Sequence, residues 1–262
     1  MRARKRFGQH FLEPAWVARL VSLIDPRPDQ TFLEIGPGRG ALTAALAPRV
    51  ARLVAVEIDR DLAAALPERM PATVRVVEGD FLDIDLAALL GDERLPIRVA
   101  GNLPYNVATP ILARLLARAD RGRLLADATL MLQKEVADRV VARPGSGDYG
   151  PLAVATALDA DAATVLTLPP GAFRPPPKVT SAVVHLRFRP PAIDVGDRAA
   201  FDRLVRGAFQ QRRKTILNAL GPPAETLGRR AADLLERAGV DPTLRPGDLP
   251  LDAFAALSRA VL

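Results

Sequence analysis

The chain of 262 residues contains no cysteine. Disulfides, thiolate nucleophiles and cysteine-ligated zinc sites are therefore excluded. Only two histidines are present, His10 and His185, and they lie far apart in the sequence, so we expect no metal site. The lack of cysteine fits a reducing compartment, and we expect a cytoplasmic protein.

Long apolar runs are also lacking. The first twelve residues are basic and no long apolar stretch follows them, so neither a signal peptide nor a membrane-spanning helix is expected. Hydrophobic residues still make up 49% of the chain, which is enough to bury a sizeable core. The length suits one α/β domain, or one such domain with a small appendage.

The net charge of +6 is concentrated at the two ends of the chain. Residues 1–12 carry four basic and no acidic side chains, whereas residues 13–173 carry 17 basic and 21 acidic ones. Residues 174–262 carry 15 basic and nine acidic side chains. This distribution fits flanking elements that bind a polyanion such as nucleic acid. An arginine-rich composition without any partner explains the charge equally well.

Strand and helix patterns alternate over the first two thirds of the chain. Short apolar runs predict strands at residues 31–35, 52–56, 74–77, 96–100 and 128–132, with helical patterns between them. This alternation predicts βαβ units and a mostly parallel sheet. Residues 162–168 and 181–188 are expected to form a closing antiparallel pair. Only helical patterns follow, so we expect an α/β domain over residues 1–189 and a small all-helical domain over residues 190–262.

Three signals at successive strand ends predict a nucleoside site. A glycine-rich turn with Gly36 and Gly38 follows the first strand, and glycines let the backbone approach a ligand closely. Glu57 ends the second strand, where an acid can accept hydrogen bonds from both ribose hydroxyls. Asp80 follows the third strand, where an acid can reach the amine of an adenine. A tight turn would explain the glycines alone, but all three signals fall on the carboxyl edge of the sheet, where ligands bind in such folds.

The turn Asn102-Leu103-Pro104-Tyr105 follows the fourth strand. The amine of adenine is a poor nucleophile because its lone pair is delocalised into the ring. The side-chain oxygen of Asn102 and the backbone carbonyl of Leu103 are suitable acceptors for the two N6 hydrogens, and would favour the pyramidal amine of a transition state. Pro104 fixes the turn, and Tyr105 offers a face on which a base can stack. The alternative is an ordinary strand-end turn in which Asn102 is a cap and Tyr105 is packing.

Two later segments are further candidates for substrate contact. Phe173 begins a proline-rich, stiff segment that is expected to hold its ring against the second face of the base, unless the segment is only a rigid surface loop. Arg212, Arg213 and Lys214 stand together at the start of a predicted helix over residues 213–220. Three adjacent cations suit phosphate contacts, although a charge run is more often a solvated face.

Six stretches, spread nearly end to end, match one family. They are GQHFL from Gly8, EIGPG from Glu34, GNLPYN from Gly101, MLQKEV from Met131, FRPPPKVTSAV from Phe173 and FQQRRKT from Phe209. Together they resemble the bacterial small-subunit (16S) ribosomal RNA adenine dimethyltransferases of the KsgA/RsmA type. The joint match is far more specific than any single motif.

The resemblance implies a Rossmann-like class I methyltransferase domain with a helical C-terminal domain, and S-adenosylmethionine as the methyl donor. It implies transfer of two methyl groups to each of two adjacent adenosines, in a hairpin loop near the 3′ end of 16S rRNA within an assembling small subunit. Nothing in the sequence suggests other than a monomer. The cofactor residues carried over by position are His10, Leu12, Gly36, Gly38, Glu57, Asp80 and Asn102. Many members of the family have asparagine where this chain has His10.

Three alternatives stay open. DNA adenine-N6 methyltransferases use a similar Asn/Asp-Pro-Pro-Tyr turn, although Leu103 stands at its second position here. The antibiotic-resistance dimethyltransferases of large-subunit RNA share the first domain, but the run of residues 212–215 favours the small-subunit group. Other relatives act by binding alone, as mitochondrial transcription factors or as assembly checkpoints. The intact cofactor and Asn102 motifs favour retained activity over binding alone.

Overall fold

The computed structural model describes residues 10–119 and 122–261. The basic side chains of Arg2, Arg4, Lys5 and Arg6 lie outside the described residues. The chain divides into two compact units. The first, here called the sheet unit, is Met1–Ala137 with Ala160–Pro190, and the second, the helical unit, is Asp138–Asp159 with Pro191–Leu262.

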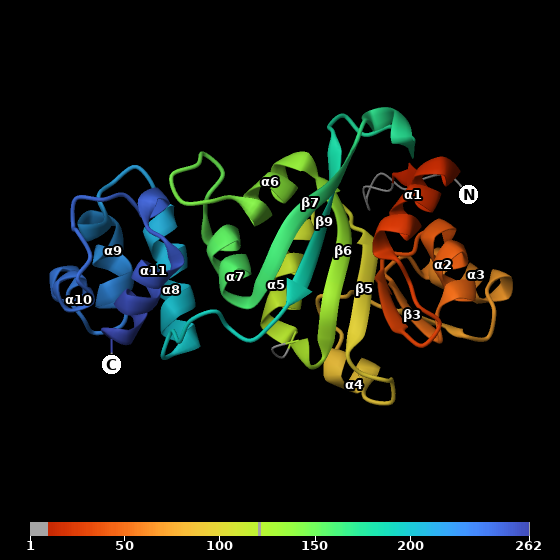
Figure 1. Cartoon of the computed structure of the whole chain (residues 1–262), viewed down its shortest axis with the longest axis horizontal. Helices are drawn as coiled ribbons and strands as arrows, with labels where there is room; N and C mark the ends of the chain where they lie inside the picture. The colour runs from red at the N-terminus through yellow and green to blue at the C-terminus, as the bar shows by residue number, and fades with distance from the viewer. Residues whose placement is uncertain (1–9, 120–121, 262) are drawn as a thin grey trace. The chain divides into compact units, whose positions relative to one another are not determined.

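A seven-stranded sheet forms the centre of the sheet unit, and Figure 1 shows β5, β6, β9 and β7 side by side. Its order is β4-β3-β2-β5-β6-β9-β7. The first five strands in this order are parallel to one another, whereas β9 pairs antiparallel with both β6 and β7. The predicted parallel sheet and its closing antiparallel pair are therefore confirmed. The bounds are β2 Thr31–Ile35, β3 Arg52–Glu57, β4 Val74–Glu78, β5 Ile97–Asn102, β6 Leu125–Gln133, β7 Ala160–Leu168 and β9 Ser181–Phe188.

Helices of the sheet unit connect these strands. The bounds are α1 Pro14–Ile24, α2 Ala41–Leu46, α3 Arg60–Ala65, α4 Leu86–Leu90, α5 Ala108–Arg118 and α6 Lys134–Val141, which runs on into the helical unit. Helix α1 begins with Pro14, a residue favoured at a first helical position. Its buried residues Val17, Leu20, Val21 and Ile24 recur at helical spacing and pack with Leu42 and Leu46 of α2 over the sheet.

A separate two-stranded sheet joins the start of the described chain to the proline-rich segment. Strand β1 (Phe11–Leu12) pairs antiparallel with β8 (Phe173–Arg174). The backbone N–H of Glu13 continues the contact by donating to the carbonyl of Ala172 at 2.9 Å. Residues about 160 positions apart in the sequence are thereby held together, which brings His10 into the neighbourhood of the carboxyl edge of the large sheet.

The helical unit has its own apolar core. Its helices are α7 Pro151–Asp159, α8 Arg198–Gln210, α9 Ile216–Glu225, α10 Ala231–Ala238 and α11 Leu251–Arg259. Phe201, Leu204 and Phe254 are among its fully buried side chains. Arg198 at the start of α8 donates two hydrogen bonds, of 3.1 and 2.7 Å, to the buried carboxylate of Asp159 at the end of α7.

The sequence assigned residues 138–159 to the first domain, whereas the structure groups them with the helices that follow residue 190. The Asp159–Arg198 ion pair and the hydrogen bond from the Tyr149 hydroxyl to the carbonyl of Leu249 give the physical reason. The predicted helix over residues 213–220 also differs. Helix α9 begins at Ile216, so the three adjacent cations lie in the turn that precedes it.

No helix in the described ranges is long and apolar enough to cross a membrane.

Candidate active site

The glycine turn after β2 brings backbone to one wall of a cavity of about 300 Å³. Gly36 and Gly38 have φ of 70° and 59°, a left-handed conformation that favours glycine. The N–H of Gly36 donates to the carbonyl of Val56 at 2.9 Å, and the N–H of Gly38 donates to a carboxylate oxygen of Glu57 at 2.9 Å. Hydrogen bonds to a backbone carbonyl and to a side chain of β3 therefore hold the glycine turn against the end of that strand.

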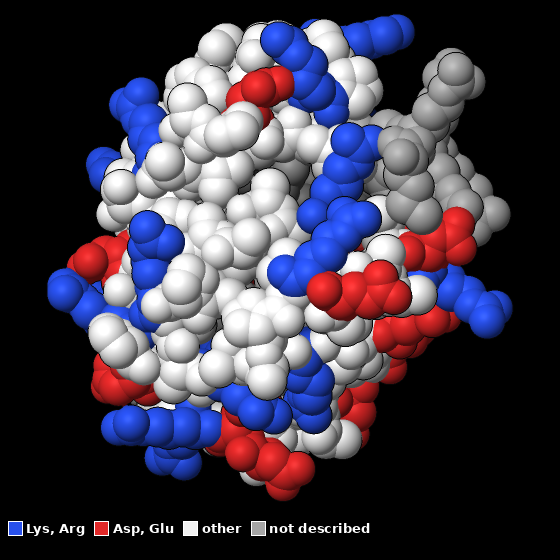
Figure 2. Space-filling view, turned by 90° about the vertical axis from the view of Figure 1, so that its right-hand side faces the viewer, with Lys and Arg blue, Asp and Glu red and all other residues white. Residues whose placement is uncertain are grey.

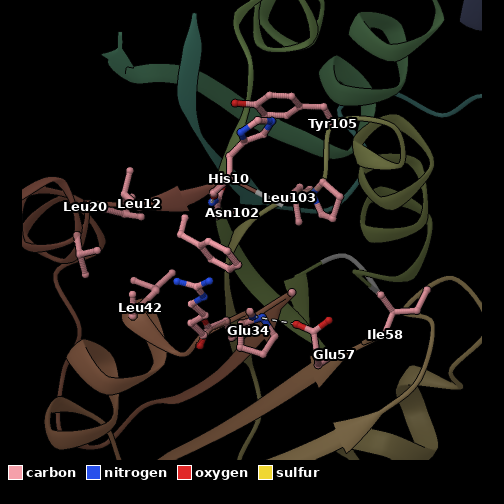
Figure 3. Close-up of a pocket in the computed structure, with 18 residues that line it drawn as sticks. His10, Leu12, Leu20, Glu34, Leu42, Glu57, Ile58, Asn102, Leu103 and Tyr105 are labelled. Atoms are coloured by element: carbon pink, nitrogen blue, oxygen red, sulfur yellow. Dashed lines mark hydrogen bonds between the residues drawn. The ribbon is translucent and has the colours of Figure 1, made fainter. Parts of the chain in front are cut away.

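Glu57 is a buried carboxylate that lines this cavity. One oxygen accepts from Gly38, and the other accepts from the N–H of Asp59 at 2.8 Å. Burial raises the pKa of Glu57, while these backbone hydrogen bonds oppose the rise. Figure 3 shows the carboxylate beside the glycine turn, where it can accept hydrogen bonds from a polar ligand.

Glu34, within β2, is a second buried acid in the wall of the cavity, and sequence reasoning missed it. Its side chain is 1% exposed, and its Oε2 has no hydrogen-bond partner in the described part of the chain. Burial raises its pKa from 4.5 to about 8, with a further rise from Glu57 and an opposing effect of the Thr43 hydroxyl. The available signal was an acid inside a short apolar strand directly before a glycine turn.

The turn after β5 forms the opposite part of the cavity, and all four of its predicted residues line it: Asn102, Leu103, Pro104 and Tyr105. The Nδ2 of Asn102 donates to the backbone carbonyl of His10 at 2.9 Å, which leaves the side-chain oxygen as an acceptor toward a ligand. The N–H of Leu103 donates a hydrogen bond of 3.1 Å to the backbone carbonyl of Met131, which holds the turn against β6.

The ring of Tyr105 is stacked on the ring of His10, with centroids 5.6 Å apart and planes 25° apart (Figure 3). The Tyr105 hydroxyl shares a 2.6 Å hydrogen bond with Ser181, and burial raises the Tyr105 pKa. The His10 Nδ1 lies 2.8 Å from the carbonyl of Pro175. One face of the ring predicted to stack on a base is therefore covered by another side chain of the same chain.

Two of the predicted catalytic and cofactor residues do not line this cavity. Asp80 accepts from the N–H of Leu82 at 2.9 Å and is only partly buried beyond the end of β4. Phe173 is 0% exposed and packs in the core beneath α1, so the structure presents no face of its ring to a base, in contrast to the sequence expectation. The reason is the pairing of β8 with β1, which places Phe173 opposite Leu12. The remaining predicted residues, His10, Leu12, Gly36, Gly38 and Glu57, do line the cavity.

The predicted RNA-binding cations are in the helical unit, and they differ in their surroundings. The guanidinium of Arg212 donates to the carbonyls of Gly147 and Ser146, at 2.6 and 2.9 Å. Arg213 and Arg245 line a small hollow with it, and Arg245 was not predicted. Lys214 is exposed.

The face of the sheet unit seen in Figure 2 carries Lys and Arg side chains around a largely uncharged middle. A groove between α1 and α2 is lined by small and apolar residues such as Val21 and Ala44, with Asp25 and Arg49 at its rim. Among residues 10–119 and 122–261, no group of three or more His, Asp or Glu side chains could hold a metal ion.

The ribosomal RNA adenine dimethylase family model matches residues 1–258. Ribosomal RNA small subunit methyltransferase A of Geobacter metallireducens is 47% identical over 270 residues, which cover 100% of this chain and 96% of that protein. The protein of the same name from Acinetobacter baylyi is 45% identical, with 98% and 92% covered.

Two solved structures are similar over nearly the whole chain. A dimethyladenosine transferase from Plasmodium falciparum has a TM-score of 0.76 at 25% identity, with 95% of this chain and 96% of that one covered. The 23S rRNA methyltransferase ErmE has a TM-score of 0.65 at 28% identity, with 96% and 99% covered.

Proposed function

Because the chain belongs to the ribosomal RNA adenine dimethylase family, we propose that it dimethylates the N6 amines of two adjacent adenosines in the 3′-terminal hairpin loop of 16S rRNA. The substrate would be the assembling small ribosomal subunit, and hence the reaction would occur in the cytoplasm. The observation that carries the proposal is the Asn102–Tyr105 turn, which lines the same cavity as the glycine turn and Glu57. A single chain supplies every residue invoked, so a monomer suffices.

The residues of the cavity fit S-adenosylmethionine. The glycine at position 38 leaves room for the Phe11 ring, since a Cβ there would lie 3.3 Å from it, and both residues line the cavity. Glu57 offers a carboxylate to ribose hydroxyls, and Glu34, whose Oε2 has no partner within the described ranges, favours a cationic ligand. His10 and Leu12 would contact the same ligand. Asp80 would contact the adenine of the ligand after a movement of the segment that follows β4.

When bound, S-adenosylmethionine supplies a methyl group on a positively charged sulfur. Asn102 and the Leu103 carbonyl would accept hydrogen bonds from the N6 hydrogens and hold the amine toward that methyl group. The nitrogen gains the methyl group and afterwards loses one proton to solvent, so no strong base is required. Pro104 keeps the turn rigid, and Tyr105 would stack on the base.

Base stacking has a structural consequence here. The base must stack on the face of Tyr105 opposite His10, or His10 must move away from the face that it covers. Phe173 would contribute a second stacking face only if it left the core. In the helical unit, we propose that Arg212, Arg213 and Lys214 meet phosphates of the RNA.

The test is methyl transfer from labelled S-adenosylmethionine to small ribosomal subunits that lack this modification. Large-subunit RNA and duplex DNA serve as controls. We expect label as N6,N6-dimethyladenosine near the 3′ end of the small-subunit RNA. Label only in a control substrate would show that the protein has the substrate of a sister group. Cofactor binding without any methyl transfer would indicate that the protein acts by binding alone.

A further inference from the structure

Glu34 is placed by the strand pattern on the face of the sheet that α1 and α2 cover. Side chains alternate along a strand, and Phe32, two residues earlier, packs against these helices. On that face, Glu34 reaches the cavity wall together with Leu20 and Leu42. Its Oε2 is buried, has no hydrogen-bond partner among the residues that the structure describes, and belongs to a residue that lines the cavity. Glu34 takes no part in the proposed transfer of the methyl group to N6.

Among residues 10–119 and 122–261, the charged and titratable groups around Glu34 offer it no direct counter-ion. Glu57 faces it from β3 and repels its charge. The helices α1 and α2 contribute only apolar residues to this wall, and the buried Thr43 hydroxyl of α2, which does not line the cavity, lowers the pKa of Glu34. Arg39 lines the cavity too, but its guanidinium lies 4.2 Å from the centre of the Phe11 ring. His10 and Tyr105 line the opposite side of the cavity, where their rings are stacked on each other.

We propose that Glu34 holds a proton while the cavity is empty and releases it when the cationic cofactor binds, so that the site distinguishes the sulfonium of S-adenosylmethionine from the neutral thioether of S-adenosylhomocysteine. This inference rests on the proposed function. A positive charge entering the cavity is the counter-ion that the empty site lacks, and it favours the carboxylate form. The product of methyl transfer keeps its amino group but has lost the positive charge on sulfur, so the proton returns to Glu34 and the product is bound less tightly.

The pH dependence follows from linkage. Burial raises the pKa of Glu34 to about 8 in the empty protein, and a bound cation lowers it. Between these two pKa values, binding releases a proton, so affinity for S-adenosylmethionine rises with pH by up to about tenfold per unit. The rise levels off above the higher pKa. The thioether product should show a weaker dependence.

Calorimetry measures the released protons directly. Each ligand is titrated into the full-length protein in two buffers that differ in ionisation enthalpy, at several pH values around neutrality. The amino group of the ligand titrates in the same range, with a pKa of roughly 8, so the decisive comparison is with Glu34→Gln. We expect the wild type to release more protons than this variant with S-adenosylmethionine, and the excess to shrink with S-adenosylhomocysteine. The exposed Glu68→Gln should match the wild type.

A direct measurement covers the case in which Glu34→Gln fails to fold. The carboxyl carbon shift of Glu34 in the wild-type protein is followed by NMR against pH, without ligand and with each ligand. We expect a lower midpoint with S-adenosylmethionine than with S-adenosylhomocysteine. Equal midpoints, or equal proton release by wild type and variant, would overturn the inference while leaving the proposed function intact. Failure of both ligands to bind the wild type would instead refute the proposed function.

Discussion

The buried acid at Glu34 should make the stability of the ligand-free protein depend on pH. Its pKa rises from 4.5 to about 8 on folding, because burial disfavours the charged form. An acid whose pKa is raised on folding binds more protons in the folded state, so the free energy of unfolding falls as pH rises between these two values. With one pKa unit worth about 1.4 kcal/mol, the loss approaches about 5 kcal/mol by pH 8.

Glu34→Gln removes this dependence and introduces a different cost. Its amide cannot ionise, but an unpartnered buried N–H₂ costs about 1–3 kcal/mol at every pH. At pH 5 the variant should therefore be less stable than the wild type. Toward pH 8 the wild type loses more than this amount, so the order of the two stabilities should reverse.

Urea unfolding from pH 5 to pH 8.5 checks this expectation. Trp16, the only tryptophan, lies in α1 and reports on the sheet unit by its fluorescence. Glu68→Gln, at an exposed position, controls for the loss of one surface carboxylate. If the wild type and Glu34→Gln change in parallel across this range, the buried acid is already ionised and the reasoning is wrong.

Three further predictions concern the proposed reaction and its substrate. Asn102→Ala should lower methyl transfer to small subunits by about 100-fold or more, with a small drop in melting temperature because the bond to the His10 carbonyl is lost, and a near-normal rate would refute its role. Tyr105→Ala should raise the KM for the RNA substrate, whereas Tyr105→Phe, which keeps the ring and loses only the bond to Ser181, should not; equal KM values for the two variants would exclude stacking. Arg213→Ala should weaken RNA binding and reduce its salt slope by about one, without a change in melting temperature. Arg212→Ala should also lower the melting temperature, because its guanidinium is bonded to two backbone carbonyls, and equal thermal stability of the two variants would contradict this distinction.

The large sheet was predictable because each strand is a short apolar run bounded by turn residues. The confirmed closing pair, β7 with β9, followed from the same signal on both sides of a proline-rich segment. These patterns involve residues close together in the sequence, so they can be recognised without knowing what packs around the strands. The family resemblance was likewise readable, since its motifs extend nearly from end to end.

Helices of the helical unit were harder to predict. Helix α7 was missed because its alanine-rich sequence continues into β7 without a stop signal, although Pro151 marked its first residue. Helix α9 continues through Pro222 and Pro223, where a break was expected. Its close packing accounts for this, since a Cβ at Gly207 of α8 would lie 2.6 Å from the side chain of Pro223. The helix propensities of neighbouring residues do not predict such long-range contacts.

The site shows the same division between local and long-range information. The glycine turn and Glu57 could be assigned to one sheet edge, because strand order and alternation fix where strands end. The burial of Phe173 depends instead on the pairing of β8 with β1. The environment of Glu34 depends on α1, α2 and β3 closing around it.

The charges of the cavity support a separation of tasks within the protein. Two buried acids, Glu34 and Glu57, line it, and this favours a positively charged ligand over a phosphate. The arginines around the hollow of the helical unit are better suited than this cavity to bind polyanionic RNA. Only the uncharged base then needs to approach the acidic cavity, beside Asn102 and Tyr105. A high salt concentration should therefore weaken RNA binding much more than cofactor binding, and equal salt dependence of the two would contradict this division.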